Sequence, residues 1–297
     1  MRGTAEAIDS APPARRRSRA HRIAYLLLAP GLLWLTVFFV IPAIQMFFVS
    51  LQTGNVDEGF SLTWHWATYT EVLSKFDTQL IRSVVYGLIV TLACLAISYP
   101  LAYTIAFRGG RWKNALLFMV ILPFFVSFLI RTLSWKFILA DEGFVLGTLK
   151  TLGLVSDGSR VLATPLAVIS GLIYNFLPFM ALPLYVSLER LDRSMIEAAG
   201  DLYASRRQAF LKVTLPLSLP GVFAGSLLTF IPSVGDFINA QLLGSVNTTM
   251  IGNVIQREMV QSNDYPEGAA ISFILMAAIL VGVAVYAKLL GTEELTG

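Results

Sequence analysis

The sequence predicts an all-α membrane protein with six transmembrane helices, and three observations support this fold class. Of the 297 residues, 56% are hydrophobic and 14% are charged, whereas an average soluble protein carries about 25% charged residues. Six apolar runs reach the roughly 20 residues that a helix needs to cross a bilayer. Because unpaired backbone polar groups are costly in lipid, runs of this length form helices and not the short alternating strands of an outer-membrane barrel.

The six expected helices follow one another along the chain, separated by short connections. They cover Ile23–Leu51, Leu80–Phe107, Ala115–Ala140, Val161–Leu188, Pro216–Gly244 and Gly268–Leu290. The loops on the outer side are too short to form a folded extracellular domain. We therefore interpret residues 23–297 as one transmembrane domain and residues 1–22 as a tail.

Prolines interrupt five of the six expected helices. A proline removes a backbone donor and kinks its helix, and the freed carbonyl groups need neighbouring helices or a water-filled path as partners. The pattern favours a bundle that surrounds a transport pathway. Gly221 and Gly225 add a small-xxx-small step that permits close helix contact. The prolines are Pro42, Pro100, Pro123, Pro178, Pro183, Pro220 and Pro232.

Basic residues fall mainly on one side of the expected membrane. Six arginines precede the first helix, and further basic clusters follow the second and fourth helices. By the positive-inside rule these segments, and with them both termini, lie in the cytoplasm. The tail, residues 1–22, is rich in arginine, alanine and proline and is expected to be disordered. We interpret its arginines as a membrane-flanking orientation signal and not as a nucleic-acid contact.

Several classes of chemistry have no support in the sequence. Cys94 is the only cysteine, and His21 and His65 are far apart, so no metal site is expected. The phosphate-binding pattern G-x-x-x-x-G-K-[ST] does not occur, so the chain is not expected to hydrolyse ATP itself. A nucleophile elbow and an H-E-x-x-H pattern are also missing. We therefore expect no catalytic, cofactor-binding or metal residues.

The polar loop of residues 190–215, between the fourth and fifth expected helices, has two helix-start signals. Ser194 and Glu197 match the capping box S-x-x-E, and Ser205 and Gln208 match S-x-x-Q. Two short helices are expected, at residues 195–202 and 206–213. A helix–turn–helix that exposes small and apolar residues needs a partner to cover it. The loop is therefore predicted to be a docking surface.

This loop resembles the EAA loop of permeases from binding-protein-dependent ABC importers. The family pattern, roughly E-A-A-x-D-L-G-A-S followed by F, V and L-P, matches at Glu197, Ala198, Ala199, Asp201, Leu202, Ala204, Ser205, Phe210, Val213, Leu215 and Pro216. Tyr203 stands where the family has glycine. A tyrosine in a left-handed turn costs about 1 kcal/mol or more, so the turn is expected to differ. The resemblance implies that Glu197, Ala198, Ala199, Asp201, Tyr203 and Ser205 couple the chain to an ATPase.

The resemblance extends from the first expected helix to the last. The segments LPFFVSFLIRTLSWKFILADEGF, LPFMALPLYVSLERLD, LPLSLPGVFAGSLLTFIPSVGDF and MIGNVIQ are similar to the spermidine/putrescine permease branch. This implies a type I ABC importer permease-like bundle with a core module at about residues 80–290 and a coupling loop at 190–215. It also implies polyamine import across the bacterial inner membrane, driven by ATP that a separate subunit hydrolyses. The implied partners are an ATPase subunit dimer, a second permease subunit, an extracytoplasmic solute-binding protein and the lipid bilayer.

Four residues within the apolar runs are candidates for a solute pathway. Asp236 is the one acid inside an otherwise apolar helix, and such residues are functional candidates by default. It lies roughly 30 Å from the cytoplasmic start of its helix, near the outer mouth. Tyr174 and Asn175 precede Pro178 in the fourth helix, and Trp135 lies in the third. Carboxylates, carbonyls and aromatic faces can replace the water around a cation.

Arg131 leaves the identity of the solute open, because a fixed cation in the third helix would repel a cationic solute such as a polyamine. It can snorkel outward, pair with Asp236 or contact the binding protein; if it faces the pathway, an anionic solute is favoured. The alternatives to a polyamine importer are thus a permease for another small solute, of the anion or iron class, and a stand-alone carrier or channel. Many such carriers contain inverted repeats, and the sequence shows none.

Overall fold

The computed structural model describes residues 27–156 and 158–290. Five helices in this part are long and apolar enough to cross a membrane, and a bent pair of shorter helices makes a sixth when the pair is counted as one span. The predicted all-α architecture with six spans is therefore confirmed. The predicted tail, residues 1–22, lies outside the described residues.

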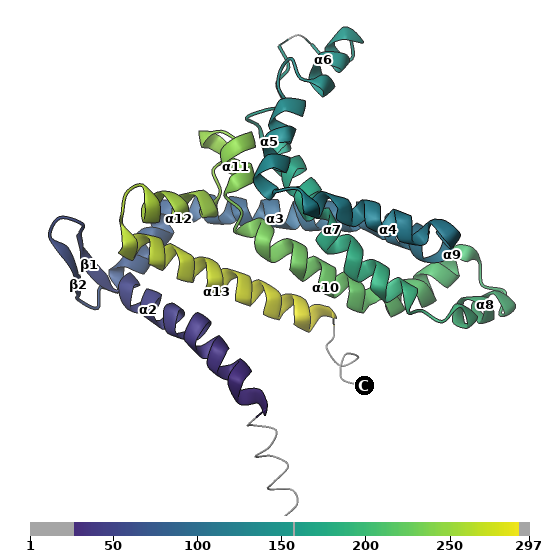
Figure 1. The fold of residues 1–297 in the computed structure, drawn as a ribbon, viewed down its shortest axis with the longest axis horizontal. Helices are drawn as coiled ribbons and strands as arrows, with labels where there is room; N and C mark the ends of the chain where they lie inside the picture. The colour runs from purple at the N-terminus through teal and green to yellow at the C-terminus, as the bar shows by residue number, and fades with distance from the viewer. Residues whose placement is uncertain (1–26, 157, 291–297) are drawn as a thin grey trace, which may run out of the picture.

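Three helices that pack against one another form the centre of the bundle (Figure 1): α3 (Ala67–Arg108), α7 (Pro165–Glu189) and α10 (Leu215–Val234). Their shared core is apolar and fully buried, with Val90 from α3 and Leu172 and Met180 from α7 among its members. Because lipid is as apolar as these side chains, it is their close packing that holds the helices together.

The contact between α7 and α10 is close because α10 presents glycines to it. A Cβ atom at Gly221 would collide with Ser187 and the carbonyl of Pro183, and one at Gly225 would meet Met180. Without a side chain at these two positions the helix backbones approach directly, as the predicted small-xxx-small step requires.

Two further spans cover one side of this centre. The first is the helix Leu27–Ser50, which contains the π-helical turn η1 (Thr36–Val40) and α2 (Ile41–Ser50). The last is α13 (Tyr265–Leu290), which contacts α2, α3 and α12. In Figure 1 the first span diverges from α13 toward its N-terminal end, and its side chains there are exposed.

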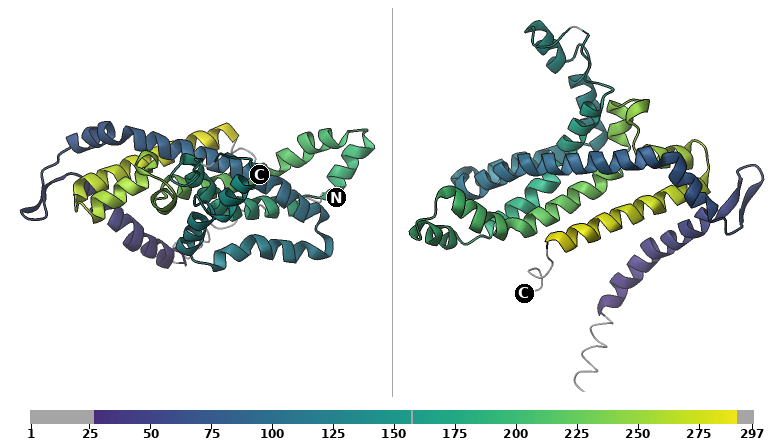
Figure 2. Two further views of the ribbon diagram at one scale, coloured as in Figure 1. Left: turned by 90° about the horizontal axis from the view of Figure 1, so that it is seen from above. Right: turned by 180° about the vertical axis from the view of Figure 1, so that it is seen from behind.

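The third span is broken, and the prediction of one helix over Ala115–Ala140 is wrong. After η2 (Gly110–Trp112), the helix α4 (Lys113–Ile121) and the 3-10 turn η3 (Leu122–Phe125) lead to two extended residues, and then α5 (Phe128–Ile138) begins. The two halves meet at 95°. Pro123 in η3 cannot donate a backbone hydrogen bond, and the chain then adopts extended angles at Val126. As a result α5, followed by α6 (Phe144–Thr151), projects away from the bundle (Figure 2).

The fifth span also ends earlier than the predicted Pro216–Gly244. The helix α10 ends at Val234, the chain turns at Gly235–Phe237, and a separate short helix, α11 (Ile238–Leu243), lies beside α5. A new helix start at this point requires its own cap, and Asp236 provides it. The chain continues through η5 (Val246–Thr248) to α12 (Ile251–Val260).

The two ends of the bundle differ in structure. One end carries the antiparallel hairpin of β1 (Gln52–Asn55) and β2 (Gly59–Leu62), in which Gln52 is opposite Leu62, together with α12. The other carries α8 (Arg193–Asp201), α9 (Arg206–Ala209) and the π-helical turn η4 (Phe210–Thr214). The basic loops gather at this second end, so it is the cytoplasmic end under the positive-inside rule. Both the first span and α13 have their free ends directed toward it (Figure 1).

Candidate functional site

The loop of residues 190–215 forms two short helices at the cytoplasmic end, as predicted, but α8 begins with a different cap. Asp192 Oδ1 accepts a hydrogen bond from the backbone N–H of Ser194 at 2.9 Å, so Asp192 is the N-cap in place of the predicted Ser194. This bond stabilises the carboxylate and lowers the pKa of Asp192. Glu197 is therefore not needed as a capping residue, and its side chain is exposed in the middle of α8. A capping role no longer accounts for the acid at this position.

The second capping box is confirmed at the start of α9. The backbone N–H of Ser205 donates to Gln208 Oε1 at 2.8 Å, and the N–H of Gln208 donates to Ser205 Oγ at 3.3 Å. These two bonds satisfy two of the backbone donors that a helix start leaves without a partner. The predicted role of Ser205 is thus structural at least in part, because its hydroxyl fixes where α9 begins.

The turn between α8 and α9 exposes apolar side chains. Tyr203 has φ of 60°, in the left-handed region that favours glycine. Its side chain is 98% exposed, and that of the neighbouring Leu202 is 82% exposed. Holding a tyrosine in this conformation costs about 1 kcal/mol or more. An exposed apolar turn at a strained position is the kind of surface that a protein partner covers.

The two short helices are fixed to the bundle at their far ends. The ring of Phe210 packs edge-on against Tyr99 of α3, with ring centroids 5.6 Å apart, and also contacts Tyr103. Arg193 Nη2 donates to the carbonyl of Ala106 at 3.3 Å. The two short helices are therefore joined to α3 by these contacts and to α10 by the continuous chain.

A buried polar network lies where α5, α7 and α11 meet. Asn175 Nδ2 donates to Thr132 Oγ1 and to Asn239 Oδ1, both at 3.1 Å. All three side chains are fully buried. A fully buried amide or hydroxyl group costs free energy unless it is hydrogen-bonded. The network therefore fixes how α5 and α11 pack against α7. One acceptor, Asn175 Oδ1, has no partner among the described residues.

Asp236 joins this network through Asn239. Its Oδ1 accepts from the backbone N–H of Asn239 at 2.8 Å and from Asn239 Nδ2 at 3.2 Å. The residue is 8% exposed. Gly252 of α12 lies against the same turn, and a Cβ there would collide with the carbonyl of Gly235. Asp236 thus has a structural role as a cap, which uses one carboxylate oxygen. Hydrogen bonds to Oδ2 are absent from the described part of the chain.

The other two candidates, Trp135 and Tyr174, form an aromatic pair beside this network: Tyr174 directly precedes Asn175, and Trp135 follows Thr132 by three residues. Their ring centroids are 5.5 Å apart in an edge-on arrangement. Trp135 is half-buried, and Tyr174 is 36% exposed. The structure therefore places the four predicted pathway residues in two neighbouring groups. Asp236 and Asn175 belong to the polar network, and Trp135 and Tyr174 form the aromatic pair.

Arg131 adopts neither of two arrangements considered from the sequence. Its side chain is 7% exposed and so does not snorkel outward, and none of the ion pairs in the described residues joins it to Asp236. The guanidinium carbon lies 5.7 Å from the ring centre of Phe124 and 5.6 Å from that of Phe128. Its Nε and Nη1 have no hydrogen-bond partner in the part of the chain that is described.

Sequence reasoning missed two members of the network, Thr132 and Asn239. A signal was available for Asn239, because it follows Asp236 by three residues, the spacing at which a side chain caps the first turn of a helix. The predicted continuous helix over this region concealed that signal. Thr132 carries no comparable pattern, and only the fold brings it to Asn175.

These features define a class of protein: a polytopic membrane permease with two short helices exposed at its cytoplasmic end. The chain belongs to a particular family within that class, described as "Binding-protein-dependent transport system inner membrane component", which matches residues 98–290, more than half of the chain. As a member of that family it is an inner-membrane transport component and not an enzyme.

Sequence relatives agree with this assignment over most of the chain. The chain is 37% identical over 254 residues to the spermidine/putrescine transport system permease protein PotB of Escherichia coli (strain K12), covering 85% of this chain and 92% of that protein. It is 37% identical to PotB of Haemophilus influenzae, covering 85% and 89%. It is 32% identical to the inner membrane ABC transporter permease protein YdcU of Escherichia coli, covering 72% of each.

Solved structures support the fold. A bacterial ABC transporter involved in the import of the acidic polysaccharide alginate gives a TM-score of 0.68 at 19% identity, covering 93% of this chain and 97% of that one. The alginate transporter in complex with an alginate pentasaccharide-bound periplasmic protein gives 0.67 at 20% identity, covering 95% and 98%. At this identity the likeness establishes the type I importer permease fold and nothing about the solute.

Proposed function

We propose that this chain is the membrane-spanning permease subunit of an ABC importer that moves polyamines, spermidine or putrescine, into the cytoplasm. The observation that carries the proposal is the 37% identity to permeases named for spermidine and putrescine transport, over 85% of the chain. The energy comes from ATP hydrolysed by a separate subunit, because the sequence has no phosphate-binding pattern G-x-x-x-x-G-K-[ST].

The surface formed by α8, α9 and the turn between them is proposed to dock on that ATPase. Glu197, Ala198, Ala199 and Asp201 lie on α8, Tyr203 forms the turn, and Ser205 caps α9. ATP binding closes the paired ATPase subunits and displaces α8. The displacement reaches α3 through Phe210 and Arg193, so the bundle switches from inward-facing to outward-facing.

The full assembly is proposed to contain a second permease, two ATPase subunits and an extracytoplasmic solute-binding protein. The hairpin of β1 and β2 and the helix α12 lie at the outer end, opposite the docking surface, where a binding protein delivers solute. For the pathway we propose Asp236 together with Asn175, Tyr174 and Trp135. The free carboxylate oxygen of Asp236 supplies the charge that an ammonium group requires, and the aromatic pair supplies cation–π faces.

One observation favours a second candidate, an importer permease for an anionic solute. The Arg131 guanidinium is buried with two unpartnered nitrogens among the described residues, and a buried charge without a partner is unfavourable. An anionic group from the solute would pair with it. A polyamine would be repelled, and the partner of Arg131 must then come from another subunit.

Uptake by the reconstituted transporter decides between these candidates. The chain is co-expressed with its ATPase, second permease and binding protein and placed in vesicles, and uptake of labelled spermidine and putrescine is measured with and without ATP. ATP-dependent uptake that unlabelled polyamines compete away and anionic solutes do not is the expected result. Competition by anionic solutes alone would contradict the polyamine assignment, and uptake that needs no ATPase subunit would indicate a stand-alone carrier.

Crosslinking tests the docking surface independently of the solute. Cys94 is the only native cysteine and is buried, so single cysteines at Ala198 or Ala199 can be introduced after Cys94→Ser. We expect these cysteines to crosslink to the ATPase subunit, and a cysteine at Glu142, in the outer loop after α5, to give no such product. Equal crosslinking from both sites, or none from α8, would contradict the proposed docking.

A further inference from the structure

The helix α5 begins without a cap, part of the way through the broken third span. Ser127 stands at its N-cap position, and within residues 27–156 and 158–290 the Ser127 side chain makes no capping hydrogen bond. The first backbone N–H groups of a helix have no partner within it and give this end a partial positive charge. Lys113, at the cytoplasmic start of α4, and Ser127 are fourteen residues apart, or about 20 Å at 1.5 Å per residue. A bilayer core is about 30 Å thick, so α5 starts within the depth of the hydrocarbon.

Arg131 lies in the first turn of α5, and its guanidinium is directed back toward the start of this helix. Side chains on a helix point toward its N-terminal end. The guanidinium carbon is 5.6 Å from the ring centre of Phe128, the first residue of α5, and 5.7 Å from that of Phe124 in η3. The side chain is 7% exposed, and Nε and Nη1 have no hydrogen-bond partner among the described residues. A buried guanidinium and an uncapped helix start therefore present positive charge to the same place.

A carboxylate is the group that satisfies this place. A buried charge without a partner is unfavourable, and anions are stabilised at helix N-termini. The two oxygens of a carboxylate also accept paired hydrogen bonds from a guanidinium. None of the ion pairs in the described part of the chain includes Arg131, so its partner does not come from these residues.

The exposed surface of α5 beside Arg131 is suited to a protein partner and not to lipid. Because α5 meets α4 at 95°, it runs across the membrane and projects away from the bundle (Figure 2). Its exposed side chains are mixed in character: Leu129 and Ile130 are apolar, whereas Ser134 and Lys136 are polar. Lipid would leave these polar groups without partners, and a second protein subunit can supply them.

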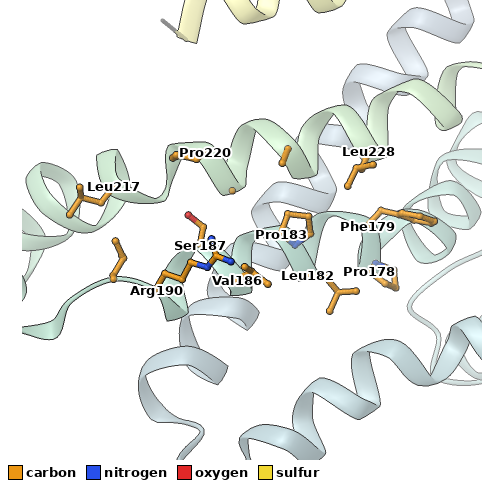
Figure 3. Close-up of a pocket in the computed structure, with 13 residues that line it drawn as sticks. Pro178, Phe179, Leu182, Pro183, Val186, Ser187, Arg190, Leu217, Pro220 and Leu228 are labelled. Carbon is orange, nitrogen blue, oxygen red and sulfur yellow. The ribbon is translucent and has the colours of Figure 1, made fainter. Parts of the chain in front are cut away.

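An apolar groove between α7 and α10 leads to the same place. It has a volume of about 670 Å³, and Figure 3 shows its lining, with Arg190 and Phe179 well apart along α7. The ring of Phe179 packs edge-on against that of Phe124, with ring centroids 5.0 Å apart, and Phe124 lies beside the Arg131 guanidinium. The groove and the unpaired cation are therefore parts of one surface. Such a surface fits a partner segment that carries apolar side chains and an acid.

We propose that the second permease subunit places a carboxylate side chain between Arg131 and the start of α5. The proposal rests on the proposed function for the presence of that subunit, and it adds the chemistry of the contact. The carboxylate neutralises Arg131, so an ammonium group of a polyamine at the neighbouring Trp135 and Tyr174 is not repelled. A free carboxylate in solution offers the same chemistry, and titration with acetate separates the two sources.

Arg131→Gln tests the pairing, because it should act differently on the isolated chain and on the permease pair. In the full chain purified alone it removes a buried, unpaired charge, so the unfolding temperature should stay the same or rise. The affinity for the second permease, measured by co-purification at increasing dilution, should fall by about tenfold, as expected for loss of a charged hydrogen bond. Lys136→Gln is the matched control, because Lys136 is an exposed cation on the same helix, and it should change neither quantity.

Acetate identifies the source of the carboxylate, with chloride at equal ionic strength as the reference. Acetate should raise the unfolding temperature of the isolated chain, and Arg131→Gln should abolish this shift. In the permease pair acetate should give no shift, because a side chain of the second subunit already occupies the place.

Three results would overturn the proposal. Unchanged affinity of Arg131→Gln for the second permease would show that this subunit does not pair with the guanidinium. A lower unfolding temperature of the isolated variant would show that Arg131 already has a partner in its own chain. An acetate shift as large in the pair as in the isolated chain would assign the site to a soluble carboxylate. Failure of the proposed function is distinct from these, because the unmodified chain itself would then not retain a second permease.

Discussion

The cytoplasmic docking surface and the buried polar network differ in how they are held together. The docking helices α8 and α9 depend on short-range bonds, such as those from Asp192 and Ser205 to the next turn, and they leave Leu202 and Tyr203 exposed. The polar network instead joins residues far apart in the chain, since Asn175 bonds to Thr132 and to Asn239. The helix caps of the first region are formed by residues close in sequence, and its turn is exposed. The second region is formed by residues that only the fold brings together, and it is buried.

This difference indicates what each region does. An exposed apolar turn that holds a left-handed tyrosine is costly for the isolated chain, which supports the proposal that a partner covers it. A buried network is costly only where a member lacks a partner, and most of its members are paired. Substitutions of the exposed side chains on α8 should therefore affect transport and leave stability almost unchanged, whereas substitutions that remove a hydrogen bond from the network should affect both.

The largest effect is expected for Glu197→Arg on the docking surface. The reversed charge places a cation where the ATPase is proposed to meet an acid, and a wrong charge at an interface costs several kcal/mol. ATP-driven uptake in vesicles should fall by more than about tenfold, while the amount of protein in the membrane and its thermal unfolding stay as before. Glu142→Arg, an equal change on the outer loop after α5, is the control and should keep uptake. Normal uptake by Glu197→Arg would remove this residue from the coupling role.

Asp236 should give the next largest effect, and two substitutions separate its charge from its capping role. Asp236→Asn keeps an oxygen that caps α11, so the free energy of unfolding should change little. Loss of the carboxylate should lower polyamine transport by about tenfold, the value of a charged hydrogen bond. Asp236→Ala should lose the same transport and also about 1 kcal/mol of stability. Uptake kinetics and thermal unfolding in detergent measure the two effects.

The matched control is Asp264→Asn. Asp264 also caps a helix start, because its Oδ1 accepts from the N–H of Glu267 at 3.1 Å, but it lies outside the network. This change should leave transport as it is. If Asp236→Asn and Asp264→Asn behave alike, Asp236 is a capping residue and not part of the pathway.

Asn239→Ala should destabilise the protein by about 1–3 kcal/mol, because it leaves Asn175 and Asp236 without a shared partner in a buried site. The double variant Asn175→Ala with Asn239→Ala should cost less than the sum of the single changes, since the two side chains bond to each other. Thermal unfolding of the purified protein measures both. Asn247→Ala, at an exposed asparagine in η5, is the control. Strict additivity would mean that the bond between Asn175 and Asn239 contributes nothing.

The smallest effect is expected at Tyr203. Tyr203→Gly removes the left-handed penalty, and the flexibility of glycine offsets part of that gain, so the turn should be stabilised by about 1 kcal/mol or less. Slower hydrogen exchange of the backbone amides in residues 199–206 measures this. Asn263→Gly is the control, because Asn263 has φ of 53° and asparagine already tolerates this region. Faster exchange in Tyr203→Gly would show that the tyrosine side chain itself holds the turn.

The sequence predicted the docking surface better than the polar network, and the reason is the range of the contacts. The capping box of Ser205 and Gln208 follows from residues next to one another, and the structure has it. The expectation of a different turn at Tyr203 was wrong, because Tyr203 adopts the left-handed conformation, with φ of 60°, in spite of its cost. The cap at Ser194 was wrong by two residues, because Asp192 is an equally good cap and lies closer to the end of α7. The two broken spans were missed because apolar composition alone does not locate a turn within a long hydrophobic run.

By itself, the sequence determined that this protein is a helical membrane permease, how it is oriented, and that the loop of residues 190–215 forms two short helices. Composition, charge placement and capping patterns act over a few residues, so they can be recognised without the fold. Only the tertiary structure decided where the third and fifth spans break and that Asn175 and Asp236 share Asn239. It also decided that Arg131 is buried with no ion pair to any of the described residues, and that a groove follows α7 and α10. Each of these depends on helices distant in the chain packing together, and no pattern within one segment specifies which side chains meet across such a contact.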